Sequence, residues 1–169
     1  MPEYLFKSIE YLDWNAVAEI QLAAYGETLV ERIDILRQKS LVARQCCFMA
    51  FDKLNGSSIG YVLAHPYPSN QTPSLDAMLE LDSIDFECCE NLFLHDFALR
   101  SEFKGKGFGL ELMQLFIERV KQLDFSSITL VAVQSSHLFW SKLGFKRCSI
   151  NSEISSYGVG AVFMKRVLE

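Results

Sequence analysis

The chain has 169 residues, of which 50% are hydrophobic and 22% are charged. This length suits one domain with one hydrophobic core, and the composition is that of a folded chain rather than a disordered one. The net charge of -5 at pH 7 argues against nucleic-acid binding, which usually needs a surplus of basic residues, and favours a cationic or neutral substrate. We therefore interpret residues 1–169 as a single domain with no nucleic-acid partner.

The cysteines and the apolar runs indicate a cytoplasmic protein. The cysteines are Cys46, Cys47, Cys88, Cys89 and Cys148. They match neither a zinc spacing nor a CxxC redox motif, so no metal is implied. An odd number of cysteines without a disulfide framework is typical of a reducing compartment. The N-terminus lacks the apolar segment of a signal peptide, and no apolar run approaches the ~20 residues of a membrane span, so we expect no membrane association.

The first half of the chain alternates between strand and helix patterns. Asp13 is expected to cap a helix that ends near Gly26, and a second helix is marked by apolar residues spaced four and three apart. Asn55-Gly56 lies between two apolar runs and predicts a hairpin, which a proline-rich loop follows. The expected elements are a strand, two helices, two hairpin strands and a short helix, over residues 3–9, 13–26, 29–36, 46–52, 57–65 and 75–81.

The second half contains the strongest helix pattern, over residues 107–123, with one apolar and one charged face. The other expected elements are strands over 90–99, 126–133, 145–150 and 157–168, and a short helix over 136–143 that Gly144 ends. Strands that alternate with crossover helices in this way predict an α/β fold class, more strictly an α+β three-layer domain.

The most specific chemical feature is the glycine loop, KGKGFG, which spans Lys104 to Gly109. Its glycines permit backbone conformations that are closed to other residues and leave the N–H groups open to a ligand. The helix that follows adds unpaired N–H donors and a partial positive charge, and Lys104 and Lys106 add full charges. The loop therefore predicts a phosphate or pyrophosphate site.

Two common phosphate motifs do not fit the glycine loop. A dinucleotide fingerprint has the spacing GxGxxG near the start of a βαβ unit, whereas this loop has GxGxG late in the chain. A P-loop needs Lys-Ser or Lys-Thr after its last glycine, whereas Phe108 follows Gly107. A nucleotide-binding protein of another fold is therefore disfavoured, and a plain glycine-rich turn remains the structural alternative.

Two segments together resemble the GNAT superfamily of N-acetyltransferases. FALRSEFKGKGFGLELM resembles the acyl-CoA motif Q/R-x-x-G-x-G/A that follows a strand ending like LAV, and VAVQSSHLFWSKLGF resembles the strand and short helix that end in FYxKLGF. Further similarity to a bacterial subgroup extends the resemblance over nearly the whole chain. Lys104 departs from the usual Gln or Arg, and Trp140 stands where the family often has Tyr.

The resemblance implies the GNAT fold, a mixed central sheet whose two central strands splay apart, with flanking helices. Acetyl-CoA would be the co-substrate, with its pantetheine arm between the splayed strands and its pyrophosphate on the amides of residues 104–109. The residues implied in acyl-CoA binding are Phe97, Ala98, Leu99, Lys104, Gly105, Lys106, Gly107, Phe108, Gly109, Ser136, Phe139 and Trp140.

The resemblance also implies acetyl transfer to a primary amine by direct attack. A backbone N–H at a strand bulge near Leu99 would polarise the thioester carbonyl. His95 and Asp96 are the candidate bases, and strict alternation along a strand would let only one of them face the substrate. The candidate acids are Tyr157, Ser136, Ser141 or solvent alone, because the indole of Trp140 supplies no proton to a thiolate at neutral pH.

Tyr25, His65 and Tyr67 are the candidate residues of the acceptor site, which in the family is walled by the first two helices and a hairpin loop. The acceptor is expected to be an amine of a small molecule or a protein. The sequence leaves the oligomeric state open, with a homodimer as one option. The alternative function is a non-catalytic acyl-CoA-binding sensor or interaction module, which the Trp140 substitution keeps open.

Overall fold

The computed structural model describes residues 4–10, 13–150 and 152–169. Within these residues the strands form one seven-stranded sheet in the order β1-β2-β3-β4-β5-β7-β6. The strands are β1 (Tyr4–Ser8), β2 (Phe48–Asp52), β3 (Ser58–Pro66), β4 (Asn91–Leu99), β5 (Ser127–Ala132), β6 (Lys146–Arg147) and β7 (Val162–Val167). The α-helices are α1 (Trp14–Leu29), α2 (Ile33–Val42), α3 (Phe108–Lys121) and α4 (His137–Lys142).

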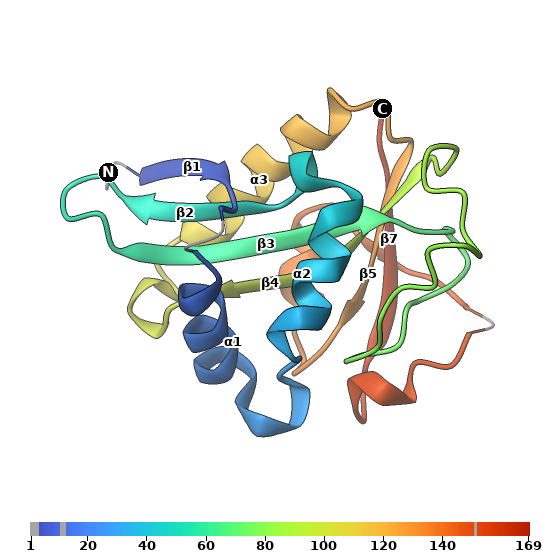
Figure 1. Cartoon of the computed structure of the whole chain (residues 1–169), viewed down its shortest axis with the longest axis horizontal. Helices are drawn as coiled ribbons and strands as arrows, with labels where there is room; N and C mark the ends of the chain where they lie inside the picture. The colour runs from blue at the N-terminus through green and yellow to red at the C-terminus, as the bar shows by residue number, and fades with distance from the viewer. Residues whose placement is uncertain (1–3, 11–12, 151) are drawn as a thin grey trace.

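The two central strands diverge from each other. β4 and β5 are parallel and pair only from Asn91 to Phe93 on β4, although β4 continues to Leu99. Beyond this short stretch β4 stays paired with β3, and β5 stays paired with β7 as far as Ala132. Figure 1 shows the two halves of the sheet running in different directions beyond this point. The splayed mixed sheet that the resemblance implied is therefore confirmed.

β4 carries a bulge where it begins to leave β5. Leu63 of β3 lies opposite Asp96, whereas the next residue, Ala64, lies opposite Leu94. His95 is therefore an extra residue in β4, and the side chains on either side of it change faces relative to a regular strand. The bulge had been expected near Leu99, which instead pairs regularly with Gly60.

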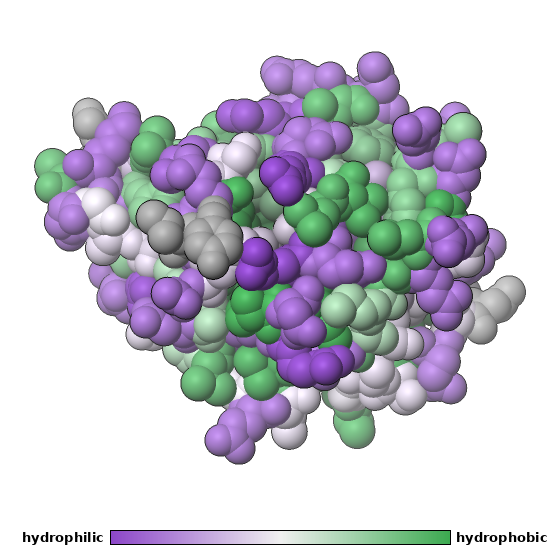
Figure 2. All heavy atoms as spheres, viewed as in Figure 1, coloured by the Kyte–Doolittle hydropathy of each residue, from purple (hydrophilic) through white to green (hydrophobic). Residues whose placement is uncertain are grey.

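Helices cover both faces of the sheet and complete three layers. α1 and α2 pack on one face, where Val17, Ile20 and Leu36 contact apolar side chains of β2, β3 and β4. α3 and α4 cover the other face, over the largest apolar cluster, to which α3 contributes Met113 and Phe116 among others. Figure 1 shows α1 and α2 in front of the sheet and α3 behind it. Figure 2 shows polar and apolar side chains interspersed on the α1/α2 face.

Several predicted elements differ in the structure. Residues 75–81 form turns and irregular backbone rather than a helix. The last strand begins at Val162, and Tyr157 lies in a short 3-10 turn before it. The strand predicted over 145–150 is confined to β6. Asp13 accepts a hydrogen bond from the Glu10 N–H instead of capping α1.

Two other features of the helices follow from the sequence. Gly26 adopts φ 67°, outside the helical region, and interrupts α1 where the sequence predicted its end. None of the helices in the described part of the chain is long and apolar enough to cross a membrane.

Candidate functional site

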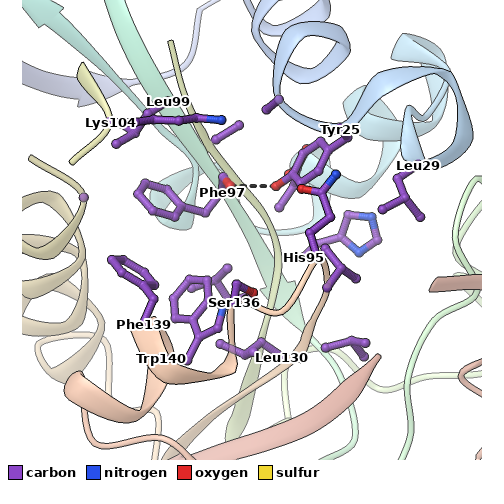
Figure 3. A pocket seen from close by; sticks show the side chains of 18 of the residues that line it. Tyr25, Leu29, His95, Phe97, Leu99, Lys104, Leu130, Ser136, Phe139 and Trp140 are labelled. Carbon is purple, nitrogen blue, oxygen red and sulfur yellow. Dashed lines mark hydrogen bonds between the residues drawn. The ribbon is translucent and has the colours of Figure 1, made fainter. Parts of the chain in front are cut away.

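A cavity of about 520 Å³ occupies the opening between β4 and β5. Its lining runs from the glycine loop, along the diverging strands, to the end of α1 and to Tyr157. Figure 3 shows Phe139 and Trp140 on one side of the cavity and Tyr25, Leu29 and His95 on another, with Phe97 between them. The cavity thus connects a predicted phosphate site to a group of titratable side chains.

The glycine loop has the open geometry that an anion site needs. Gly105 and Gly107 adopt φ 72° and 88°, and a Cβ placed at either glycine meets no protein atom within 4 Å. Gly107 directly precedes α3, whose first N–H groups have no partner within the helix. Backbone donors and the partial charge of the helix N-terminus therefore lie at the mouth of the cavity.

Most of the residues predicted to bind acyl-CoA line this cavity, namely Phe97, Ala98, Leu99, Lys104, Gly105, Gly107, Gly109, Ser136, Phe139 and Trp140. Lys106 and Phe108 do not line it. Phe108 is buried against Tyr4 and Phe103, so its backbone, and not its ring, is what the helix N-terminus presents.

Aromatic side chains form one wall of the cavity. Phe97 stacks on Phe139 at 6.0 Å between ring centroids, and Trp140 meets both rings edge-on. The indole N–H of Trp140 donates to the Ser136 hydroxyl at 3.2 Å. Trp140 therefore packs as part of the cavity wall and of the core.

Backbone groups of β4 point into the cavity. The Arg100 N–H donates to Ile59 of β3, and N–H groups alternate in direction along a strand. The N–H groups of Phe97 and Leu99 therefore point away from β3, toward the side that β5 has left. The Phe97 carbonyl, on the same edge, accepts the Tyr25 hydroxyl at 2.6 Å. Leu99 can thus present an N–H to a carbonyl because β5 diverges, without a bulge beside it.

His95 and Asp96 face the same side of the sheet, contrary to the prediction that only one of them could. His95 contacts Glu31, in the connection between α1 and α2, and Asp96 contacts Tyr61 of β3. The bulge at His95 explains the result, because an extra residue places two successive side chains on one face. Both residues line the cavity.

Asp96 is a buried carboxylate with an altered acidity. Its Oδ2 accepts the Tyr61 hydroxyl at 2.6 Å. Burial raises the pKa of Asp96 to about 6, and the hydrogen bond from Tyr61 opposes this shift. Burial and the nearby Asp96 charge raise the pKa of both phenols well above 10, so each stays a proton donor.

His95 belongs to a buried cluster of charged groups. Its Nε2 lies 2.5 Å from Glu31 Oε1 and 3.0 Å from Lys39 Nζ, and Lys39 Nζ lies 2.9 Å from Glu31 Oε2. All three side chains are at most 4% exposed. Burial would raise the pKa of Glu31, but His95 and Lys39 together hold it well below its usual value. Burial lowers the pKa of Lys39, against the attraction of Glu31.

The residues predicted for the acceptor site separate in the structure. Tyr25 lines the cavity, whereas His65 and Tyr67 do not. His65 is buried among the rings of Tyr67, Phe93 and His95, and its Nδ1 lies 3.0 Å from the Pro66 carbonyl. Burial, and next the neighbouring His95, lower the pKa of His65 to about 3. The His65 ring is therefore neutral and belongs to the core beneath the site.

Tyr157 lies at the end of the cavity opposite the glycine loop. It is buried, and its hydroxyl donates to the Pro73 carbonyl at 2.6 Å. Burial raises its pKa well above 10. This hydrogen bond links the proline-rich loop to the turn before β7. It also uses the hydroxyl proton that a general acid would have to donate. A catalytic role for Tyr157 stays a prediction.

Lys39 was missed by sequence reasoning. The sequence does carry a signal for Lys39. It lies on the stripe of α2 that also buries Ile35, Leu36 and Ser40, and a lysine on a buried stripe requires a charged partner. The partner itself could not be identified from the sequence, because Glu31 and His95 reach Lys39 only through the tertiary fold.

The sequence matches the model of the acetyltransferase (GNAT) family over residues 14–145. This match covers most of the chain. The chain therefore belongs to the GNAT acetyltransferase family. Membership supports acyl transfer from an acyl-CoA in general terms. None of the curated proteins compared with the chain matches it significantly.

Solved structures share the fold at low sequence identity. The ribosomal-protein-S18-alanine N-acetyltransferase from Escherichia coli is 14% identical, with a TM-score of 0.70 over 98% of this chain and 94% of its own. A chain of the NatC complex bound to Gag peptide and CoA is 14% identical, with a TM-score of 0.72 over 99% of both chains. The loading GNATL domain of CurA from Lyngbya majuscula is 10% identical, with a TM-score of 0.78 over 98% of both. At these identities the likeness shows the fold alone.

Proposed function

We propose that this chain is a single-domain N-acyltransferase that moves an acetyl group from acetyl-CoA to a primary amine of a small molecule or protein. The observation that carries the proposal is the cavity that joins the glycine loop to His95 and Asp96. One end offers backbone donors for a pyrophosphate, and the other offers groups that can take a proton from an amine.

The residues around the cavity suit acyl-CoA. Gly109 lies close to the Phe139 ring, since a Cβ there would be 3.3 Å from it, so any larger residue would narrow the passage. Lys104 adds a positive charge at the same end. The aromatic wall of Phe97, Phe139 and Trp140 suits the pantetheine arm, and the free N–H groups of Phe97 and Leu99 suit the thioester carbonyl.

In the proposed reaction the amine nitrogen bonds to the acetyl carbon, the carbon–sulfur bond breaks, and the amine proton passes to a base. His95 is the proposed base. The 2.5 Å contact between its Nε2 and Glu31 Oε1 needs a proton between the two atoms, which leaves Nδ1 of the neutral ring free to accept another. Asp96 is the second candidate, because its pKa of about 6 makes it a stronger base than an exposed carboxylate.

The acid that meets the leaving thiolate is proposed to be solvent. Trp140 supplies no proton, and the Tyr157 hydroxyl donates to Pro73. A CoA thiolate is stable enough near neutral pH to leave without a dedicated acid, and the proton held by the base can return to the sulfur through water.

The acceptor end of the cavity suits a cationic amine. Glu31 and Asp96 bring two carboxylates to this end, and Tyr25, Leu29 and Leu75 add aromatic and apolar surface. Carboxylates next to the reaction centre attract an ammonium and stabilise it before it loses its proton. We propose the cytoplasm as the compartment, where acetyl-CoA is available.

The first experiment combines thermal shift with an amine screen. A ligand bound only by the native state at ~100 times its Kd stabilises that state by ~2.7 kcal/mol. We expect acetyl-CoA and CoA to raise the unfolding midpoint, ATP not to raise it, and at least one amine to be acetylated. Stabilisation by CoA without turnover of any amine would favour the alternative of an acyl-CoA sensor. No stabilisation of the folded protein by CoA would refute both.

His95→Gln and Asp96→Asn identify the base. We expect His95→Gln to lower kcat by ~100-fold or more, the usual range for loss of a general base, with little change in the KM for acetyl-CoA. Asp96→Asn is expected to raise the KM for the amine more than it lowers kcat. The reverse pattern would assign the base to Asp96.

A further inference from the structure

Three charged or titratable side chains from separate elements meet beneath the cavity. Glu31 lies in the connection between α1 and α2, Lys39 on α2 and His95 in the bulge of β4. They are linked by the contacts of 2.5, 2.9 and 3.0 Å given above, and their side chains are almost wholly excluded from solvent. Burying three such groups is costly unless each is paired, so the arrangement demands a physical reason.

The carboxylate of Glu31 is fixed from several directions. Its Oε2 accepts hydrogen bonds from Lys39 Nζ at 2.9 Å and from the Asp76 N–H at 2.8 Å. Its backbone N–H and carbonyl are both bound by the Gln21 side chain, at 3.1 and 2.7 Å. Glu31 Oε1 is therefore held in one place, directed at the His95 ring.

The geometry then determines where the His95 proton lies. Two groups approach Nε2, namely Glu31 Oε1 at 2.5 Å and Lys39 Nζ at 3.0 Å. A carboxylate can only accept, so the shorter contact places a proton on Nε2, and Lys39 Nζ then donates to Glu31 Oε2 at 2.9 Å rather than to the ring. In the neutral ring Nδ1 then has a free lone pair. Nδ1 is buried and has no hydrogen-bond partner among the described residues, and His95 lines the cavity. Nδ1 is thus the ring nitrogen that no described residue engages.

We propose that Glu31 and Lys39 are positioning residues, which hold His95 as its Nε2–H tautomer so that Nδ1 accepts the proton of the acceptor amine. Glu31 fixes the ring and its proton, and Lys39 fixes Glu31. The catalytic part of this role rests on the proposed function, whereas the tautomer does not.

The charges around His95 balance when it takes that proton. The carboxylates of Glu31 and Asp96 stabilise an imidazolium, and Lys39 opposes it. His65, whose ring centroid lies 5.6 Å from that of His95, stays neutral, and so do the phenols of Tyr25 and Tyr61. Two negative groups, Glu31 and Asp96, thus surround the ring together with one positive group, Lys39. Removing Glu31 and removing Lys39 shift this balance of charge in opposite directions.

The direct test is the ring-nitrogen NMR spectrum of protein labelled with 15N-histidine. The chain has only three histidines, so His65→Gln and His137→Gln assign the signals. We expect His95 in the wild type to show a protonated Nε2 and an unprotonated Nδ1. In Glu31→Gln we expect a mixture of tautomers. The Nδ1–H tautomer in the wild type, or an unchanged spectrum in Glu31→Gln, would overturn the proposal.

Kinetics test the catalytic consequence. We expect kcat to fall by roughly 100-fold or more in Glu31→Gln with the KM for acetyl-CoA unchanged, because loss of the orienting carboxylate in a Ser-His-Asp triad costs about 10⁴. The acidic limb of the pH profile should move to lower pH in Glu31→Gln and to higher pH in Lys39→Met. A wild-type kcat in Glu31→Gln contradicts a positioning role. So does an acidic limb that moves in the same direction in Glu31→Gln and in Lys39→Met.

Matched controls separate this effect from a general loss of charge. Glu118 and Lys121 form an exposed ion pair at 3.5 Å on α3, away from the cavity lining, so Glu118→Gln and Lys121→Met should leave the spectrum and kcat unchanged. Where a single variant fails to fold, the double variant Glu31→Gln/Lys39→Met removes both charges and leaves the net charge of the buried site unchanged.

The double variant should fold, lose the tautomer preference and show the low kcat. If it keeps the wild-type tautomer and rate, the proposal is wrong. Failure of the proposed function looks different, because the wild type itself would then turn over no amine while its tautomer could still be measured.

Discussion

At the residue scale, Asp96 and Tyr61 form the most informative pair. Tyr61 is almost wholly buried and donates its hydroxyl to Asp96 Oδ2 at 2.6 Å. Because burial raises the pKa of Asp96 to about 6 from 3.8, the folded state holds the Asp96 proton more tightly than the unfolded state does. The stability associated with this group is therefore full below pH 3.8 and is lost as the pH rises through 6.

This pH dependence of stability gives a prediction for Tyr61→Phe. Removing the hydroxyl leaves an ionised Asp96 without a donor, which costs ~1–3 kcal/mol of the free energy of unfolding. The loss should be larger at pH 8 than at pH 5, where Asp96 is largely protonated. Urea unfolding at the two pH values measures it, with Asp96→Asn as the background that should abolish the difference. An equal loss at both pH values would show that Asp96 does not ionise in this range.

The glycines of the loop give a second prediction at this scale. In Gly107→Val a β-branched residue would have φ 88°, and its side chain would project into space that no protein atom occupies. We expect the Kd for CoA, measured by calorimetry, to rise at least about tenfold, because the side chain blocks access to the N–H groups.

Gly56→Val is the matched control for that variant. Gly56 has φ 72° and equally open surroundings, but it lies in the β2–β3 hairpin away from the cavity. Both variants should lose similar stability from backbone strain, and only Gly107→Val should lose CoA binding. Similar CoA affinities in the two variants would mean that the loop is a structural turn.

At the scale of elements, β4 organises the site. It pairs with β3 along its length, leaves β5 after Phe93 and takes up the extra residue His95. One edge of β4 therefore pairs with β3, and the other edge faces the cavity. β3 and β4 approach each other closely at Gly60, where a Cβ would lie 2.5 Å from both the Ala98 carbonyl oxygen and Leu99 Cδ2.

Gly60→Ala tests the dependence of the site on this contact. The added methyl group must displace the backbone of β4 next to Leu99, and overpacking of this kind costs ~1–3 kcal/mol. We expect a lower midpoint in chemical denaturation together with a raised KM for acetyl-CoA. A loss of stability with no change in KM would show that β4 absorbs the shift before it reaches the cavity.

At the scale of the whole molecule, the buried histidine beneath the site links stability to pH. The pKa of His65 is lowered to about 3 from 6.5, because burial, and next His95, disfavour its charged form. The unfolded chain therefore binds a proton at this group at a higher pH than the folded chain does. Its contribution to stability is full above pH 6.5 and is lost progressively as the pH falls toward 3.

The corresponding prediction compares the wild type with His65→Gln, which cannot titrate. Because other groups, Asp96 among them, also titrate below pH 7, the difference between the two proteins isolates His65. On lowering the pH from 6.5 to 4.5, the free energy of unfolding of the wild type should fall relative to the variant by up to ~1.4 kcal/mol per pH unit. Parallel curves would mean that His65 titrates equally in both states.

The sequence by itself determined the order of the elements, the splayed sheet and the glycine loop. These features depend on local signals, namely hydrophobic periodicity, Asn55-Gly56 and glycines before an amphipathic helix, and on a resemblance that those signals locate. Local signals were weaker where tertiary contacts dominate. The helix predicted over 75–81 is absent, and there the backbone of Leu79 bonds to the Gln38 side chain of α2 instead.

Only the tertiary structure decided the arrangement at the acceptor end of the cavity. The sequence identified His95 and Asp96 but assigned them to opposite faces, because strand alternation is a local rule and a bulge is set by pairing with another strand. It could not join Lys39 to His95, since 56 positions separate them along the chain and the packing of α2 on the sheet brings them to 3.0 Å. Burial, which lowers the pKa of Lys39 and raises that of Asp96, exists only once that packing has formed.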